Sequence, residues 1–521
     1  MTIHARQGRI SADAKAAVQR TDDPAVPVAD VSSLSPGAAT TPLSLAEIRT
    51  MIVSLALTMF LAALDQTIVA TALPTIGQQF HDVANLSWVI SAYLLASTAM
   101  APVFGTLSDI YGRRAMIILS LSLFLAGSIL CAVAPNLPVL IFARGLQGIG
   151  GGGIVPLVQT TVSDLVSPRE RGRYQSYFSA VWVTAAIGGP VLGGVFAEHL
   201  HWSMIFWINL PLGLGALAML LPKMRRMPTY HRRRKVDWVG GLLLMASVVV
   251  VMLVLTWGGT RVAWFSPTIA LMVGAAVLLA GAFVWHAQRI DEPFLPLPLM
   301  GGPVVPFSML TVGCGSGAMV GLTVLLPLYY GPVYHLSASE AGMGLIPLVA
   351  ASVPGASLAG WWMAHMKRYK GIAIFGTASA AAAGLLLVII SPLPLWLLLT
   401  ILSLLGFGLG TIFPVSVVSV QNSVARSQIG TATGALNFSR ALFGSLTVAA
   451  FTTILMMALG VQMAAEETQR GMMTSIPASD MATAFRYVFA AATALLAVAS
   501  LSLFLMEERP LAGPPAAKPA S

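Results

Sequence analysis

The stretch GIGGGGIVP, Gly148–Pro156, places glycines at 148, 150 and 152 and a proline four residues later. A second stretch, GFGLGTIFP at 406–414, repeats this spacing 258 residues further on, and Gly172 after the first copy corresponds to Gly430 after the second. Glycines in apolar helices let helix backbones approach one another closely. The shared ladder therefore predicts two related helical bundles in one chain.

The two copies differ in polar residues just before the ladder. Arg144 and Gln147 in the first copy correspond to Leu402 and Leu405 in the second. The first bundle is therefore expected to keep polar chemistry that the second lacks.

The composition indicates a polytopic membrane protein. The chain of 521 residues is 56% hydrophobic and 9% charged, whereas ordinary soluble domains are about 25% charged. The net charge of +9 comes from short basic clusters between apolar runs. Positively charged cytoplasmic loops explain that pattern better than a nucleic-acid partner does, so no nucleic-acid binding is expected.

Fourteen apolar segments are long enough to cross a hydrocarbon core of about 30 Å, which takes about 20 helical residues. The predicted spans are 49–72, 86–107, 115–134, 137–162, 174–197, 203–221, 238–257, 267–287, 305–329, 340–363, 371–391, 395–418, 432–456 and 484–505. The basic stretch KMRRMPTYHRRRK, 223–235, is interpreted as a junction between two halves.

These features divide the chain into five parts. We expect a disordered cytoplasmic tail (1–47), an N-terminal six-helix bundle (48–222), a basic loop with two inserted helices (223–304), a C-terminal six-helix bundle (305–506) and a cytoplasmic tail (507–521). With the N-terminus inside, 24 of the 29 lysines and arginines fall in cytoplasmic segments. The positive-inside rule and the even number of spans then predict that both termini are cytoplasmic.

The cysteines and histidines give no sign of a metal site or a disulfide framework. Cys131 and Cys314 lie far apart inside apolar runs, where inert buried thiols are expected. His199 and His201 form an HxH pair with no carboxylate or cysteine grouped with them. No metal and no cofactor are therefore expected.

Several motifs lie in order along the chain. GTLSDIYGRR at 105–114 joins the second and third spans; its glycines allow a tight turn, and its aspartate can face a helix N-terminus. It resembles motif A of the major facilitator superfamily, which typically reads GxLaDrxGrk. LIFARGLQGIGGG (140–152) resembles motif B, and AAIGGPVLGG (185–194) resembles motif C of the antiporters. LDQTIVATALP (64–74) and WSMIFWINLPLG (202–213) resemble signatures of the fourteen-helix drug:proton antiporters (EmrB/QacA type).

The resemblance spans about residues 48–506. It implies an all-α membrane protein with the major facilitator fold, in which two six-helix bundles and two inserted central helices make 14 transmembrane helices. It also implies a proton-coupled multidrug efflux transporter of the bacterial inner or plasma membrane, not an enzyme. Two residues depart from the pattern: Ala185 replaces the first glycine of motif C, and Ser203 replaces the arginine expected after Trp202.

The resemblance implies that motifs A and C control conformation. Motif A would join the two halves on the cytoplasmic side, with Asp109 near the N-terminus of the span that starts around Thr431. Motif C would kink the fifth span at the interface between the halves and limit leak. Simple anchoring or close packing is the alternative for each motif. The residues concerned are Gly105, Asp109, Gly112, Arg113, Arg114, Gly189, Pro190, Gly193 and Gly194.

Asp65 and Arg144 are predicted to lie at the same depth. If the first span begins near Met51, Asp65 lies about 21 Å along it, roughly 9 Å from the outer edge, at about 1.5 Å per residue. The fourth span runs the other way from Leu137 and places Arg144 about 10 Å from that edge. A carboxylate that exchanges a proton beside an arginine that cannot lose one favours proton coupling. A purely structural salt bridge is the alternative.

Aromatic and amide side chains in the spans are expected to line a cavity for lipophilic substrates. For each of them, packing in the core or against lipid is the alternative. The candidate residues are Gln66, Trp88, Tyr93, Gln147, Phe178, Trp182, Tyr329 and Tyr330. Protons, small lipophilic substrates that are cationic or neutral, and the lipid bilayer are the expected partners, and a periplasmic adaptor is left open. No acid lies deep in the second half, so one cycle is expected to carry one proton, and dications should be poor substrates.

Three other functions were weighed. The same fold could carry a specific metabolite, siderophore or lipid, because a fold does not determine a substrate. An intramembrane enzyme would need His, Asp or Cys groups that converge near a membrane face, and the sequence offers none. A channel is disfavoured because repeated pore-lining charges are absent from the sequence.

Overall fold

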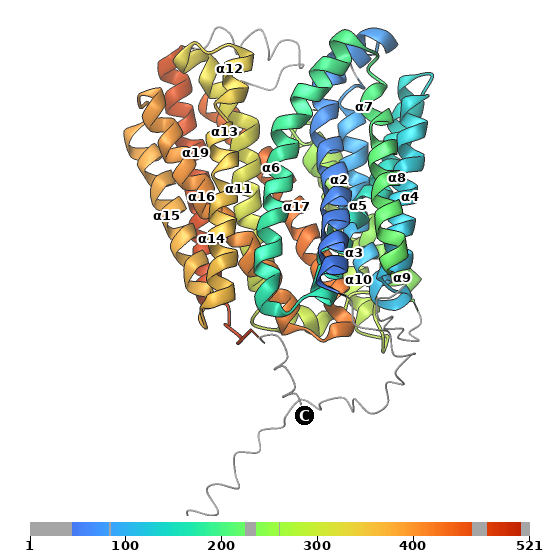
Figure 1. The fold of residues 1–521 in the computed structure, drawn as a ribbon. Coiled ribbons are helices and arrows are strands. Elements are labelled where there is room, and N and C mark those ends of the chain that lie inside the picture. Colours follow the sequence, from blue (N-terminus) through green and yellow to red (C-terminus); the bar gives the residue numbers. More distant parts are fainter. Residues whose placement is uncertain (1–43, 83–84, 225–235, 260, 461–476, 512–521) are drawn as a thin grey trace, which may run out of the picture. The chain divides into compact units, whose positions relative to one another are not determined.

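The computed structural model describes residues 44–82, 85–224, 236–259, 261–460 and 477–511, and Figure 1 shows the fold. In these residues, fourteen helical segments are long and apolar enough to cross a membrane. The expected all-α membrane fold with fourteen spans is thereby confirmed. Most of the two predicted tails, and residues 225–235 of the predicted basic loop, lie outside the described residues.

The first helix starts earlier than predicted, because its N-terminus is capped. α2 begins at Leu45, so the last residues of the predicted tail 1–47 are helical. The side chain of Ser44 accepts a hydrogen bond from the backbone N–H of Glu47, and the Glu47 carboxylate accepts one from the backbone N–H of Ser44 at 2.9 Å. This reciprocal capping satisfies two N–H groups that would otherwise lack partners.

The first half consists of helices that pack around α5 and α2. α5 packs against α3 and α4, and α2 packs against α6 and α8. In Figure 1 these helices run from blue to green. Their bounds are α2 (Leu45–Phe80), α3 (Trp88–Tyr111), α4 (Arg113–Ala132), α5 (Leu137–Leu165), α6 (Pro168–His199), α7 (Met204–Trp207) and α8 (Asn209–Met224).

Two inserted helices, α9 (Trp238–Trp257) and α10 (Pro267–Ala287), pack against each other, and α9 also packs on α3. Asp237 caps α9 and accepts hydrogen bonds from the backbone N–H groups of Gly240 and Phe294, at 2.8 and 3.1 Å. His286 lies 2.8 Å from the same carboxylate. Burial raises the pKa of Asp237, but these hydrogen bonds outweigh burial and hold the pKa below the usual value.

The second half packs around α11, which contacts α17 and α19, while α15 contacts α16 and α19. The span predicted at 340–363 is divided into three helices. Proline cannot donate the backbone hydrogen bond of a helix interior, and Pro347 begins a new helix instead. The bounds are α11 (Val305–Tyr334), α12 (Ala338–Met343), α13 (Ile346–Ala350), α14 (Ser352–His365), α15 (Lys370–Ile390), α16 (Leu395–Ser423), α17 (Ile429–Ala458) and α19 (Ala478–Leu505), with short 3-10 turns at Leu297–Gly301 and Arg426–Gln428.

The two glycine ladders make equivalent contacts in the two halves. Gly152 and Gly150 of α5 lie against backbone atoms of α3 and α4, and Gly410 and Gly408 of α16 lie against backbone carbonyls of α14 and α15. A Cβ at any of these positions would collide with the neighbouring helix. The repeated spacing in the sequence thus corresponds to a repeated packing arrangement.

Two further glycine crossings bring the halves together at the helix ends that carry motif A. A Cβ at Gly434 of α17 would lie 2.8 Å from the carbonyl oxygen of Ala101 in α3. A Cβ at Gly360 of α14 would lie 2.5 Å from the carbonyl oxygen of Gly172 in α6. Both crossings need bare backbone on at least one side, so the halves are in close contact at this end.

Candidate functional site

A buried ion pair lies at the centre of the first half. Arg144 Nη1 is 2.7 Å from Asp65 Oδ2, and the two side chains are 1% and 0% exposed. Gln147 Nε2 donates to Asp65 Oδ1 at 2.7 Å, and Asn209 Nδ2 donates to the same oxygen at 3.1 Å. The carboxylate on α2 therefore receives hydrogen bonds from α5 and α8, and the predicted nearness of Asp65 and Arg144 is confirmed.

The surroundings of this pair satisfy most of the remaining donors. Arg144 Nε donates to the carbonyl oxygen of Val89 at 3.0 Å, and its guanidinium carbon lies 4.3 Å from the centre of the Tyr93 ring. Ser128 Oγ on α4 accepts from Gln147 Nε2 at 2.8 Å and from Asn209 Nδ2 at 3.2 Å. Five helices thus hold one carboxylate in an apolar interior, where an uncompensated charge is costly.

The equivalent place in the second half is apolar. Leu402 and Leu405, which correspond to Arg144 and Gln147 in the ladder, are fully buried in the core of the second half. The difference read from the sequence therefore corresponds to a polar cluster in one half and hydrophobic packing in the other.

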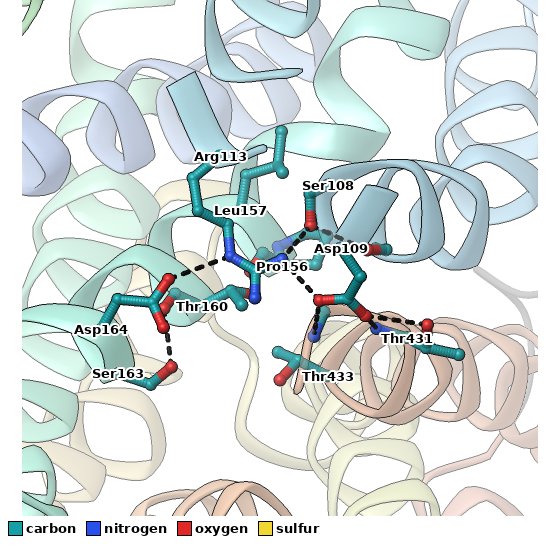
Figure 2. A network of polar contacts seen from close by, with 12 residues as sticks. Ser108, Asp109, Arg113, Pro156, Leu157, Thr160, Ser163, Asp164, Thr431 and Thr433 are labelled. Atoms are coloured by element: carbon teal, nitrogen blue, oxygen red, sulfur yellow. Dashed lines mark hydrogen bonds and ion pairs between the residues drawn. The ribbon is translucent and has the colours of Figure 1, made fainter. Parts of the chain in front are cut away.

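A second network joins the two halves through Asp109 (Figure 2). Its carboxylate accepts hydrogen bonds from the backbone N–H groups of Gly430 and Thr431 at 2.9 and 2.8 Å, and from Thr431 Oγ1 at 2.9 Å. These groups form the N-terminus of α17, where a negative charge is favoured. The predicted pairing of Asp109 with this helix start is confirmed.

Arg113 connects Asp109 to the end of α5. Its Nη1 donates to Asp109 and to Ser108 Oγ at 2.6 Å each, and its Nε lies 3.0 Å from Asp164 Oδ2. Gly112 between α3 and α4 has φ 88°, a conformation that glycine adopts without strain. Arg114 is half-buried, and no contact assigns it a role in this network.

The motif C glycines Gly189 and Gly193 pack against α2. Gly189 and Gly193 face Thr67 and Thr71 of α2, so they pack α6 within the first half and not against the second. Thr67 Oγ1 donates to the carbonyl oxygen of Ala185 at 2.8 Å in the same contact. Gly194 has open space at its Cβ position, and α6 continues through Pro190 as one helix. The two glycines thus face α2, while α6 itself also contacts α14 and α16 of the second half, and the predicted role of motif C in limiting leak stays a prediction.

Most of the aromatic cavity candidates pack in helix interfaces. Tyr329 is buried against Phe485 and Phe489, and Tyr330 donates to the carbonyl oxygen of Gly344 at 2.9 Å. Phe178 is buried in the core of the first half, and Trp88 packs edge-on against Trp257 of α9. Tyr93 and Gln147 belong to the Asp65 cluster. Gln66 and Trp182 are half-buried.

Sequence reasoning missed Arg440. This arginine lies within the span predicted at 432–456, and its guanidinium carbon lies 4.6 Å from the centre of the Trp182 ring and 5.4 Å from that of Phe413. A charge inside an apolar run was the available signal, the same one that pointed to Asp65.

The comparisons with known proteins agree with this fold. The family model described as Major Facilitator Superfamily matches residues 55–448. The chain is 36% identical to "MFS-type efflux pump LUC4" of Fusarium sp over 76% of its length and 71% of the relative. It is 34% identical to "MFS transporter L2" of a Phoma species over 76% of its length and 67% of the relative.

Solved structures show the same fold. The human organic anion transporter MFSD10 superposes with a TM-score of 0.59 over 88% of this chain and 99% of its own, at 16% identity. A bacterial homologue of the iron transporter ferroportin superposes with a TM-score of 0.58 over 90% of this chain and 100% of its own, at 12% identity. At these identities the likeness concerns the fold alone. The chain belongs to the major facilitator superfamily, and it is a multi-pass membrane transporter, not an enzyme.

Proposed function

We propose that this chain is a proton-coupled efflux transporter that carries lipophilic small molecules out of the cell by alternating access. Export is supported by several relatives of 34–36% identity that are named efflux pumps. We also place both termini in the cytoplasm and the protein in a plasma or bacterial inner membrane, as the distribution of basic residues favours.

The observation that carries proton coupling is the Asp65 cluster. Asp65 accepts from Arg144, Gln147 and Asn209 on two other helices. Protonation would remove the charge that holds these donors and leave Arg144 without its counter-ion. Because an unpaired buried charge is costly, the cluster must rearrange when a proton binds. A proton would thereby change the packing of α2, α5 and α8 against one another.

Asp109 supports alternating access. Its hydrogen bonds to the start of α17, together with the glycine crossings, close the molecule at the end that we place in the cytoplasm. Opening that end to receive substrate requires these bonds to break. A proton that rearranges the Asp65 cluster can bias this step, since α5 carries both Arg144 and Asp164, the ion-pair partner of Arg113.

Asp65→Asn tests the proposal. The amide keeps the size of the side chain but cannot exchange a proton, so a pH gradient across proteoliposomes should no longer drive transport of a dye such as dansylglycine methyl ester. Asp480→Asn, which removes a carboxylate from the outer end of α19, is the matched control and should retain transport. Parent-like, gradient-driven transport by Asp65→Asn would leave the ion pair as structure only.

A further inference from the structure

The charge of Arg440 lies in the interior of the bundle. Arg440 is eleven residues from the start of α17, or about 16 Å along the helix. The Trp182 ring that lies 4.6 Å away belongs to α6 of the first half, and the Phe413 ring at 5.4 Å belongs to α16 of the second. The guanidinium group therefore lies where the two halves face each other, held by aromatic rings on both sides.

Arg440 has no counter-ion among the residues that the structure describes. In the part of the chain that the structure describes, no ion pair and no hydrogen bond involves its side chain. Two other arginines within the spans have oxygen partners: Arg144 pairs with Asp65, and Arg486 donates to the carbonyl oxygen of Ser391. An arginine cannot escape by losing its proton, so this charge persists.

Two N–H groups near Arg440 also lack a hydrogen-bond acceptor among the described residues. The indole N–H of Trp182 is buried without a partner among the described residues. One turn before Arg440, Asn437 Nδ2 donates to Gln159 Oε1 of the first half at 2.8 Å, and Gln159 Nε2 is likewise without a partner. The junction between the halves therefore offers a fixed positive charge and free N–H donors together.

We propose that Arg440 and Trp182 recognise the acidic group of a lipophilic organic anion, which names the substrate class of the efflux function proposed above and rests on it. A planar guanidinium can bind a carboxylate or sulfonate through two parallel hydrogen bonds, and the rings of Trp182 and Phe413 suit an apolar, flat body. The cationic or neutral substrates expected from the sequence took no account of Arg440. Asp65, the carboxylate that lies deep among the described spans, is already paired with Arg144.

Three dansyl derivatives with one fluorophore and different charges test the proposal by equilibrium binding to the purified full chain. Dansylglycine carries −1, its methyl ester is neutral, and the dansyl derivative of ethylenediamine carries +1. We expect the parent to bind dansylglycine at least about tenfold more tightly than the other two, because only the anion provides a counter-ion for Arg440. A parent protein without this preference contradicts the proposal.

Substitutions at Arg440 test whether this residue causes the preference for dansylglycine. Arg440→Gln should lower the affinity for dansylglycine to that of the methyl ester, and Arg440→Lys should keep the carboxylate preferred. Arg173→Gln is the control: Arg173 also lies over an aromatic ring, that of Tyr177 at 5.9 Å, but on an exposed helix surface. Thermal unfolding shows whether each variant is folded. An unchanged preference in folded Arg440→Gln, or loss of it in folded Arg440→Lys, overturns the assignment.

The binding assay and the transport assay separate the two proposals. If Arg440 discriminates by charge in binding while no variant responds to a pH gradient, the anion site stands and proton-coupled efflux fails. If Asp65 proves essential for gradient-driven transport while Arg440→Gln binds all three dyes as the parent does, proton coupling stands and the anion site fails.

Discussion

Asp65 and Arg144 neutralise each other in a buried place where either charge alone would be costly. Their separation of 2.7 Å and complete burial mean that little solvent screens them. Removing one partner of such a pair typically costs about 3–5 kcal/mol, because the other charge is left buried and unpaired. The carboxylate can relieve that cost by binding a proton, and the arginine cannot.

Arg144→Leu leaves Asp65 without its counter-ion, and it introduces the residue found at the equivalent position of the second half, Leu402. Without the arginine, the uncharged form of Asp65 is favoured, so the pH dependence of transport should move upward or activity should disappear. The measurement is the initial rate of dye transport in proteoliposomes across a pH series.

A double variant serves as the control for damage to the fold. Asp65→Leu combined with Arg144→Leu removes both charges and should recover most of the thermal stability lost in Arg144→Leu, but no gradient-driven transport. A pH profile of Arg144→Leu that matches the parent would assign Arg144 a structural role alone.

At the scale of the element, the start of α17 is held by a carboxylate from the other half of the molecule. Asp109 supplies acceptors for two backbone N–H groups, Gly430 and Thr431, that no residue of α17 itself satisfies. A charge at a helix N-terminus is worth about 0.3–2 kcal/mol. That range suits a contact that must form and break in every cycle.

Asp109→Ala should weaken the closed arrangement of α3 and α17. Turnover is expected to fall severalfold while dye affinity changes by less than about twofold, since Asp109 binds Thr431, which lies about 14 Å along α17 from Arg440. A cysteine introduced as Ala101→Cys at the α3–α17 crossing should react faster with maleimide when Asp109 is absent. The native Cys131 and Cys314 are both buried and should contribute little background.

Glu170→Ala is the matched comparison. Glu170 also places a carboxylate at a helix start, but it caps its own helix, α6, through Ser167 and does not reach the second half. The labelling rate at position 101 should not change in this variant. If Asp109→Ala abolished dye binding with unchanged labelling, motif A would act on substrate and not on conformation.

The number and order of the spanning helices could be predicted from the sequence. Which side of each helix faces the core, a cavity or lipid could not. In a membrane, core and lipid favour the same side chains, so an aromatic residue in a span does not reveal which side it faces. Tyr329 and Tyr330 therefore looked like cavity residues and proved to be packed in the second half. Asp65 was located correctly because a carboxylate in an apolar run has few acceptable partners, and Asp109 because the motif A resemblance and the helix dipole both pointed to the start of α17.

Across the whole molecule, the charges of the two proposed functions add up to a testable electrical signature. If one proton enters through Asp65 while one organic anion leaves, two positive charges move inward in each cycle. Each elementary charge is worth about 2.3 kcal/mol per 100 mV. An interior-negative potential should therefore drive dansylglycine export strongly, methyl ester export about half as strongly, and export of the ethylenediamine derivative hardly at all.

Proteoliposomes clamped with potassium and valinomycin, at a fixed pH difference, measure this series directly. The slope of the logarithm of the accumulation ratio against potential should stand near 2:1:0 for the three dyes. Slopes that differ by one charge from dye to dye but are shifted together from 2:1:0 would show that the proton count is wrong. Equal slopes would show that the dyes do not cross with these charges, and Asp65→Asn shows how much of each slope comes from the proton.

The unequal repeats also bear on how such a protein can change over generations. Both copies carry the glycine ladder, but among the described residues the polar cluster beside it lies in the first half, and Arg440, the arginine held by aromatic rings, lies in the second. If Asp65 couples the proton and Arg440 selects the cargo, as proposed, energy supply and choice of cargo are encoded in different halves of one gene. Substitutions around Arg440 would then change the cargo and leave proton coupling unchanged.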